Sequence, residues 1–294
     1  MPKPIQADLA LILVTFVWGS TFTVVKIGIE QVSPVLFVAL RFWVAAVIVA
    51  ALMPGQIKKI SRRSFRHGLV LSVMLVGGFV FQTLGLRSTG PSQSAFITSL
   101  SVILVPLLGF LIFRHRPRMQ TLAGVILATA GLFLLLVNLA DLDFRPGDVL
   151  TLICAVMFGF QILLLGRFLS VTDHRQLMLL QMACTAVICT LLVPLIEKPF
   201  MVWNSTVALC LFITGVLATA FALYVQTWAQ RYTTPNHAAL IFSLEPFFAV
   251  LFAYWILGHV LTSREWLGGL LVLAGILVSE LRISALKKME NVER

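Results

Sequence analysis

Two twenty-residue stretches of this chain repeat each other without a gap, and this repeat constrains the possible folds most. Residues 81–100 and 225–244 are identical at nine of twenty positions. The identities include a Gln-Thr pair, an arginine and a proline, which apolar sequence would not align in one register by chance. Further pairs follow at nearly the same spacing: Gly124 with Gly268, Gly131 with Gly275, Asp8 with Asp148 and Gly19 with Gly159. The sequence therefore predicts a tandem duplication, with residues 1–140 as the first repeat and 141–294 as the second.

The composition indicates that both repeats lie in a membrane. Hydrophobic residues make up 59% of the chain and charged residues 12%, against about 45–50% and about 25% in a soluble domain. Apolar segments of about 20 residues, enough to cross a hydrocarbon core, use up nearly the whole chain and leave no room for a soluble catalytic domain. Ten spans are expected, at residues 8–29, 34–53, 65–86, 92–113, 119–138, 147–167, 175–196, 204–228, 236–257 and 265–284.

The basic residues predict the orientation of these spans. With the N-terminus inside, cytoplasmic segments hold sixteen of the 22 lysines and arginines and external segments hold four, so both termini are expected in the cytoplasm. The net charge of +10 is thereby assigned to cytoplasmic loops, and no nucleic-acid partner is expected. Five spans in each repeat force the second repeat to enter the membrane from the opposite side. The predicted fold is all-α, with ten transmembrane helices as two inverted five-helix repeats, an architecture typical of secondary transporters.

A set of short motifs runs through the chain in a fixed order. They are Trp18-Gly19-Ser20-Thr21-Phe22, Lys26, Leu40-Arg41-Phe42, Ser243-Leu244-Glu245-Pro246-Phe247 and Trp266-Leu267-Gly268-Gly269 followed by Gly275. In this combination the chain resembles the EamA-type, ten-helix branch of the drug/metabolite transporter superfamily, from Ala10 to about Arg282. The resemblance implies a multi-pass transporter of a bacterial-type inner membrane. One departure concerns a glutamate that family members carry after the glycine ending the fourth or ninth span, where this chain has Arg114-His115-Arg116 and Gly258-His259.

Glu245 is the sharpest single signal. It lies about ten residues into the ninth span, hence ~15 Å deep at 1.5 Å per residue, where a charge costs roughly 2.5–3.5 kcal/mol. Its counterpart in the first repeat is Ser101, so the carboxylate breaks the internal symmetry. A carboxyl group in an apolar cavity can exchange a proton for a cationic substrate, and we expect Glu245 to bind substrate, proton or both. The alternative is a structural glutamate that caps backbone groups freed by Pro246.

Arg41 and two glutamines are the next polar residues within spans. Arg41 lies ~10 Å deep and is expected to anchor a carboxylate or helix-end carbonyls, with substrate contact as the alternative; Lys26, near the end of its span, can snorkel. Gln82 and Gln226 occupy equivalent positions near opposite ends of the third and eighth spans. They are candidate gates, one near each mouth of the pathway, or else they form interhelical hydrogen bonds.

Several motif and aromatic residues complete the candidate substrate site. Trp18, Ser20, Thr21, Tyr224 and Trp228 lie at or inside span edges. Trp and Tyr beside one carboxylate would suit an organic cation through cation–π contact. Core packing or contact with lipid is the alternative for each aromatic side chain.

The remaining patterns indicate scaffold rather than chemistry. Small residues on one face of the fifth and tenth spans, Gly124-x3-Ala128-x2-Gly131 and Gly268-x6-Gly275, allow close helix approach, either within the chain or in a homodimer. The four cysteines all lie in apolar segments and the five histidines show no ligand spacing. No metal site, cofactor or disulfide is expected, and no HExxH, GxSxG or Walker motif is found.

These observations favour a secondary transporter over an enzyme, because only one deep carboxylate and no nucleophile–base pair can be identified. The expected substrate is a small polar metabolite, amino-acid-like or amine/drug-like, moved by alternating access and coupled to protons if Glu245 carries one. A lipid or lipid-precursor flippase is the alternative, and it would need a lateral opening between helices.

Overall fold

The computed structural model describes residues 2–114, 116–136, 145–257 and 262–290, without the side chains of 253–257 and 280–290. All regular structure in these ranges is helical apart from one isolated bridge between Val32 and Met201. Eight described helical segments are long and apolar enough to cross a membrane, and a shorter apolar helix covers Met119–Leu135. With the final helix, they match the positions of the predicted spans. The all-α membrane fold is therefore confirmed.

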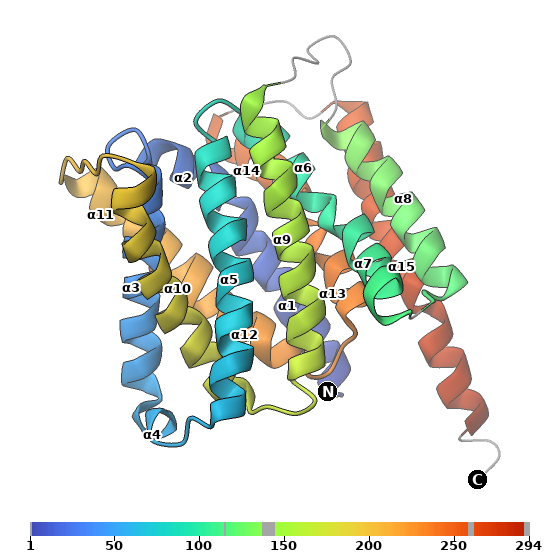
Figure 1. Cartoon of the computed structure of the whole chain (residues 1–294). Helices are drawn as coiled ribbons and strands as arrows, with labels where there is room; N and C mark the ends of the chain where they lie inside the picture. Colours follow the sequence, from blue (N-terminus) through green and yellow to red (C-terminus); the bar gives the residue numbers. More distant parts are fainter. Residues whose placement is uncertain (1, 115, 137–144, 258–261, 291–294) are drawn as a thin grey trace.

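The helices follow one another along the chain with short connections (Figure 1). In the first repeat they are α1 (Lys3–Gly19), α2 (Thr21–Gly28), α3 (Pro34–Leu52), α4 (Pro54–Ile57), α5 (Arg62–Gly85), α6 (Pro91–Ser99), α7 (Ser101–Phe113) and α8 (Met119–Leu136). In the second they are α9 (Pro146–Phe168), α10 (His174–Ile196), α11 (Ser205–Leu211), η2 (Phe212–Phe221), α12 (Ala222–Ala229), α13 (Pro235–Phe242), α14 (Glu245–Leu257) and α15 (Ser263–Glu290).

Proline at the first helical position sets where several helices begin. Pro34, Pro91, Pro146 and Pro235 open α3, α6, α9 and α13, where the missing N–H has no helical partner and the fixed φ suits the first turn. Pro91 and Pro235 are the repeated proline of the sequence comparison. The two repeats therefore begin their fourth helices in the same way.

Three spans are interrupted near their middle. α1 passes into α2 at Ser20, α6 into α7 at Leu100, and α13 into α14 at Ser243-Leu244. Leu100 has φ −61° and ψ −12°, and Ser243 has φ −66° and ψ −6°, values typical of a 3₁₀ turn. Leu100 and Leu244 are equivalent in the two repeats, so both halves break their fourth span at the same point.

The eighth span contains a different irregularity. Between α11 and α12, residues 212–221 form the π-helix η2, whose i→i+5 hydrogen bonds leave carbonyls off the regular α-helical ladder. Gly215 allows η2 to approach α3, because a Cβ there would lie 3.0 Å from Val44 and 3.3 Å from the Arg41 carbonyl oxygen.

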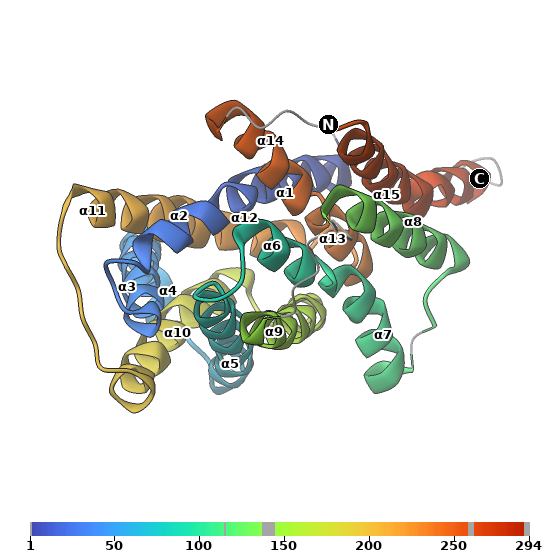
Figure 2. The same ribbon diagram turned by 90° about the horizontal axis from the view of Figure 1, so that it is seen from above.

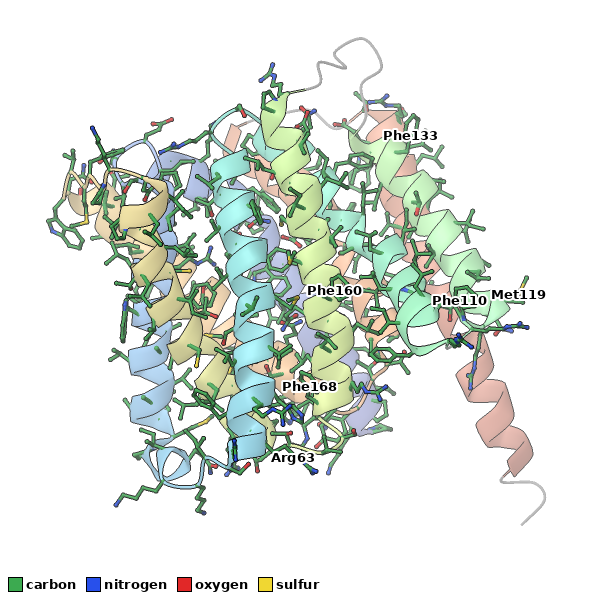
Figure 3. The ribbon with its side chains drawn as sticks, viewed as in Figure 1. Arg63, Phe110, Met119, Phe133, Phe160 and Phe168 are labelled. Atoms are coloured by element: carbon green, nitrogen blue, oxygen red, sulfur yellow. The ribbon has the colours of Figure 1, made fainter. Side chains whose placement is uncertain are left out.

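Figures 1 and 2 show the spans as a bundle with α3, α10 and α11 at one end and the α8–α15 pair at the other. Apolar side chains on the flank of α7 and α8 point outward, as Phe110, Met119 and Phe133 do in Figure 3. Their exposed fractions are 44%, 78% and 45%. Large apolar side chains exposed along membrane-spanning helices are the surface that contacts lipid tails.

The glycine faces of α8 and α15 pack on each other within one chain. A Cβ on Gly131 would lie 2.6 Å from the Gly268 carbonyl oxygen, and one on Gly124 would lie 2.6 Å from the Gly275 carbonyl oxygen. Of the two predicted roles, the scaffold contact accounts for these glycines. These small residues are covered within one chain, and a homodimer contact stays a prediction.

The connections alternate between two faces, as an odd number of spans in each repeat requires. On the face that carries the N-terminus, Lys3 lies over the Tyr232 ring at 5.5 Å and His67 contacts Thr172 at 2.7 Å. On the opposite face Arg87 pairs with Glu197 at 3.9 Å. Loops that the sequence assigns to the same side of the membrane thus lie together.

Candidate functional site

A central cavity lies where the interrupted helices meet. Its cavity volume is about 50 Å³, smaller than the about 300–1,000 Å³ typical of small-molecule sites. Its lining comes from both repeats: Trp18, Thr21, Arg41, Leu75, Phe79, Gln82, Thr98, Ser101, Phe158, Gln161, Ile162, Leu223, Gln226, Phe242 and Glu245. Six of the residues predicted as substrate-binding are among them: Trp18, Thr21, Arg41, Gln82, Gln226 and Glu245.

Glu245 is the first residue of α14, directly after the break in the ninth span. A carboxylate at this position is stabilised by the positive end of its own helix. Among the residues that the structure describes, none forms a hydrogen bond or ion pair with the Glu245 side chain. Ser101, its counterpart at the start of α7, also lines the cavity. The two broken helices therefore contribute equivalent residues to the lining of the central cavity, the acidic Glu245 and the neutral Ser101.

The glycine of the Trp18-Gly19-Ser20 motif explains how α1 reaches this break. A Cβ on Gly19 would lie 2.8 Å from the Glu245 carbonyl oxygen and 2.8 Å from the Phe248 Cβ. No real side chain fits there, so Gly19 is required for α1 to pack directly against the first turn of α14. The motif thereby sets the Trp18 and Thr21 side chains beside Glu245 in the cavity.

Trp18 and Arg41 both bind the irregular helix η2. The Trp18 Nε1 donates to the Ala218 carbonyl oxygen at 2.8 Å. The Arg41 Nε donates to Thr219 Oγ1 at 2.9 Å, and its Nη2 donates to the Thr214 carbonyl oxygen at 3.4 Å. Thr219 Oγ1 in turn donates to the same Thr214 oxygen at 2.7 Å. The expected partner was a carboxylate or helix-end carbonyls, whereas Arg41 binds one carbonyl within the π-helix, that of Thr214, and the Thr219 hydroxyl.

The remaining part of the Arg41 guanidinium faces the cavity wall. Its carbon lies 4.5 Å from the centre of the Phe79 ring, a cation–π distance, and the side chain is 2% exposed. The Nη1 makes no hydrogen bond to any residue in the described ranges. Arg41, a lining residue of the cavity, therefore combines an anchoring role with one nitrogen, Nη1, that no described residue engages.

Both predicted gate glutamines line the cavity and both are hydrogen bonded. Gln82, in the last turn of α5, donates to Thr98 Oγ1 at 3.4 Å. Gln226 in α12 donates to Gln161 Oε1 at 3.1 Å, and Gln161 donates to Gln181 Oε1 at 3.1 Å. The interhelical hydrogen bonds of the alternative interpretation are present. Gln82 lies in the last turn of α5 and Gln226 within α12, and their role as gates stays a prediction.

Three predicted residues are not part of the cavity lining. Ser20 donates its hydroxyl to the Val17 carbonyl oxygen at 2.7 Å. Tyr224 is 36% exposed on the outside of α12, and Trp228 packs on Tyr232 with ring centres 5.4 Å apart. The aromatic side chains of the cavity are Trp18 and three phenylalanines, Phe79, Phe158 and Phe242. The expectation of a Trp and Tyr cluster was wrong because residues 224 and 228 lie on another face of α12.

Other sequence-based expectations concern the neighbourhood of the site. Lys26 donates to the carbonyl oxygens of Leu86 and Arg87 and so caps the end of α5. His115, Gly258 and His259 lie outside the described residues. Within the described part of the chain, no group of three or more His, Cys, Asp or Glu could hold a metal ion.

The EamA-like transporter family model matches residues 5–137 and 145–281, that is, both halves separately. The chain belongs to the EamA-like transporter family. A protein of Archaeoglobus fulgidus named only as a transporter is 33% identical over 288 residues, covering 96% of this chain and 88% of that protein. A Salmonella typhimurium protein named "Probable amino-acid metabolite efflux pump" is 24% identical over 291 residues, covering 91% and 92%.

A solved crystal structure has the same fold, with a TM-score of 0.78 at 20% sequence identity over 96% of this chain and 98% of the other. Membership of this family and the apolar helices together identify a multi-pass membrane transporter. The duplication inferred from the sequence corresponds to the two family matches.

Proposed function

We propose that this member of the EamA-like family moves amino-acid-like or amine solutes through the central cavity by alternating access. The observation that carries the proposal is Glu245, a carboxylate that lines the cavity and is not paired with any described side chain. A carboxylate in such a position needs a cation or a proton to offset its desolvation. The ammonium group of a substrate and a proton can each serve this purpose, which is the minimum requirement for proton antiport.

Arg41 extends the proposal from amines to zwitterions. It lines the same cavity with one nitrogen that is not engaged by described residues. An amino acid carries an ammonium group for Glu245 and a carboxylate for Arg41, while Trp18 and the phenylalanines offer an apolar wall for a side chain. The name of the Salmonella typhimurium relative supports the same substrate class.

The paired helix breaks support the proposal of alternating access. Both repeats interrupt their fourth span at equivalent positions, and inverted repeats with broken helices at the substrate site are typical of secondary transporters. With the termini in the cytoplasm, the Gln82 end of the cavity faces outward and the Gln226 end faces the cytoplasm.

The flippase alternative is less well supported. A flippase needs a lateral path between the bilayer and the central site. A second hollow lies beside α7 in the described molecule. The lining of this hollow shares no residue with the lining of the central cavity.

The experiment compares matched ligands on reconstituted protein. An amino acid, its decarboxylated amine and its deaminated acid are offered to proteoliposomes as labelled substrates, with and without a pH gradient. We expect uptake of the amino acid or amine and none of the acid. Uptake of the acid alone would contradict the role of Glu245.

Glu245→Gln keeps the size and hydrogen-bonding capacity of the side chain but cannot ionise. A hydrogen bond to a charged group contributes about 1.5–3 kcal/mol, so we expect affinity for an amine to fall about 10- to 150-fold. Response to a pH gradient should be lost, while thermal stability stays near that of the unmodified protein. Glu30→Gln is the matched control, because Glu30 is exposed after α2 and carries the same charge. Unchanged transport and pH response in Glu245→Gln would assign Glu245 to structure.

A further inference from the structure

A second hollow, with a cavity volume of about 520 Å³, lies at the edge of the bundle, on the face that carries the N-terminus. It is bounded by α7, the connection from α7 to α8, the end of α9 and the start of α13. Its lining residues are Pro106, Gly109, Phe113, Arg116, Pro117, Arg118, Gln120, Thr121, Leu163, Gly166, Arg167, Thr234, Pro235, Asn236, His237, Leu240 and Ser279. Figure 2 shows α7 diverging here from both α8 and α9.

Three arginines give this hollow a basic mouth. Arg116 and Arg118 come from the connection between α7 and α8, and Arg167 comes from the last turn of α9. The Arg167 guanidinium carbon lies 4.3 Å from the centre of the Phe113 ring, which holds it beside the hollow. None of the described lining residues is an aspartate or glutamate. No ion pair to a carboxylate is found for any of the three arginines within the described ranges.

A described carboxylate, that of Asp8, contacts one of the lining residues. Asp8 is not a lining residue, but it contacts His237 Nε2 at 3.3 Å. Among the described residues, its contact is therefore with His237 and not with any of the three arginines. Neutral donors also line the hollow, in the side chains of Gln120, Thr121 and Asn236.

The other end of the hollow is apolar and borders the lipid-facing surface. Pro106, Gly109, Leu163 and Leu240 line it. The outer side of α7 exposes Leu107, Phe110 and Leu111, at 46%, 44% and 63%, and Phe110 points outward in Figure 3. A chain lying in this groove could pass from the arginines directly into the hydrocarbon region.

We propose that this groove binds an anionic phospholipid, with the phosphate group at Arg116, Arg118 and Arg167 and an acyl chain along α7. The positive-inside rule accounts for the number of basic residues in such loops. The same rule does not explain why arginines from two separate parts of the chain line one hollow whose described lining has no acidic residue. Basic pockets between membrane helices on the cytoplasmic side are the setting in which anionic headgroups bind.

The test uses the full-length protein purified in detergent, titrated with phosphatidylglycerol, phosphatidylcholine or inorganic phosphate while thermal unfolding and the mass of bound lipid are measured. We expect phosphatidylglycerol to bind and stabilise, and the other two to have little effect. One basic side chain contributes about fivefold to binding of anionic lipid. Arg116→Gln/Arg118→Gln/Arg167→Gln should therefore weaken phosphatidylglycerol binding about a hundredfold.

The control is Arg62→Gln/Arg63→Gln/Arg66→Gln, which removes the same charge from the same face at the start of α5, where Figure 3 labels Arg63. If the control weakened phosphatidylglycerol binding equally, the effect would be general electrostatic attraction of the anionic lipid, and the proposal would be overturned. Equal stabilisation by phosphatidylcholine would show that the arginines do not select the ligand. Displacement of the lipid by millimolar phosphate would identify a free-phosphate site instead.

A second variant tests the groove without changing charge. A Cβ on Gly109 would meet only Leu163 Cδ1, at 3.6 Å, so a side chain at this position extends into the groove. Gly109→Leu should keep the unfolding temperature of the lipid-free protein and lose the mass of bound phosphatidylglycerol. Retention of the lipid by Gly109→Leu would place its acyl chain elsewhere and contradict the proposal.

Discussion

Gly131→Ala tests whether the α8–α15 contact is part of the scaffold. The added methyl would lie 2.6 Å from the Gly268 carbonyl oxygen and 2.7 Å from the Val272 nitrogen. Both are backbone atoms, so the two helices must separate, at a cost of about 1–3 kcal/mol typical of overpacking. Alanine also favours the helix by about 0.5–1 kcal/mol relative to glycine, which partly offsets this cost.

Gly109→Ala is the matched control, because it brings the same helical gain and only an ordinary contact, at 3.6 Å from Leu163. The difference between the two variants isolates the packing cost of about 1–3 kcal/mol. At about 2–4 °C per kcal/mol for a chain of comparable size, Gly131→Ala should unfold at least about 2 °C below Gly109→Ala. Thermal unfolding in detergent measures this difference, and light scattering measures the mass of the particle.

Equal unfolding temperatures would refute the argument from the glycine contacts. A change of mass, with a dimer splitting in Gly131→Ala, would show that the small-residue face of α8 holds a second copy. We expect the mass to stay unchanged, since both glycine faces are covered within one chain.

Two further predictions concern topology and gating. A reporter fused after Arg116 should be cytoplasmic and one fused within residues 141–144 external; the same side for both would refute the five-span repeat. In cysteine labelling, Gln82→Cys should react faster in outward-open conditions and Gln226→Cys in inward-open conditions, because the two residues lie near the ends of helices that run in opposite directions. Labelling that is insensitive to substrate would contradict the gating role and assign both glutamines to interhelical hydrogen bonding.

The sequence was sufficient to predict the helices and the charged members of the site. Glu245 and Arg41 stand out because a charge within an apolar segment needs a local reason. The breaks at Leu100 and Leu244 were not predicted, nor was the π-helix η2. The breaks and the π-helix both depend on how backbone groups pair across helices. An apolar sequence gives little indication of this pairing.

The apolar members of the cavity could not be predicted for a related reason. α7 is apolar on all sides, so periodicity does not distinguish its cavity face from its lipid face. α12 offered a usable signal that was missed. Gln226 marks the cavity face of this helix, and Leu223 precedes it by three residues. At about 100° per residue, Tyr224 and Trp228 must point elsewhere, because each lies two residues from Gln226. Gln161, a polar residue within the apolar sixth span, could also have been identified.

Pseudo-symmetry relates two further contacts that lie at opposite faces of the bundle. On the face opposite the N-terminus, Asp148 at the start of α9 accepts a hydrogen bond from Gln93 Nε2 of α6 at 2.8 Å. On the N-terminal face, Asp8 of α1 contacts His237 Nε2 of α13 at 3.3 Å. Asp8 corresponds to Asp148 at a spacing of 140 residues, and Gln93 to His237 at 144. Each half therefore uses equivalent positions to join its first helix to the fourth helix of the other half.

In an alternating-access cycle these pairs are expected to open in turn, one on each side. Gln93→Ala removes the first contact while Thr89 still donates to Asp148 at 2.7 Å, and Asp8→Ala removes the second. A hydrogen bond to a carboxylate contributes about 1.5–3 kcal/mol, so each change should shift the balance of outward-open and inward-open states about 10- to 150-fold. Gln93→Ala should then increase labelling of Gln82→Cys and decrease that of Gln226→Cys, and Asp8→Ala should do the reverse. A shift in the same direction for both variants would mean that the two pairs support the fold without closing either side of the pathway.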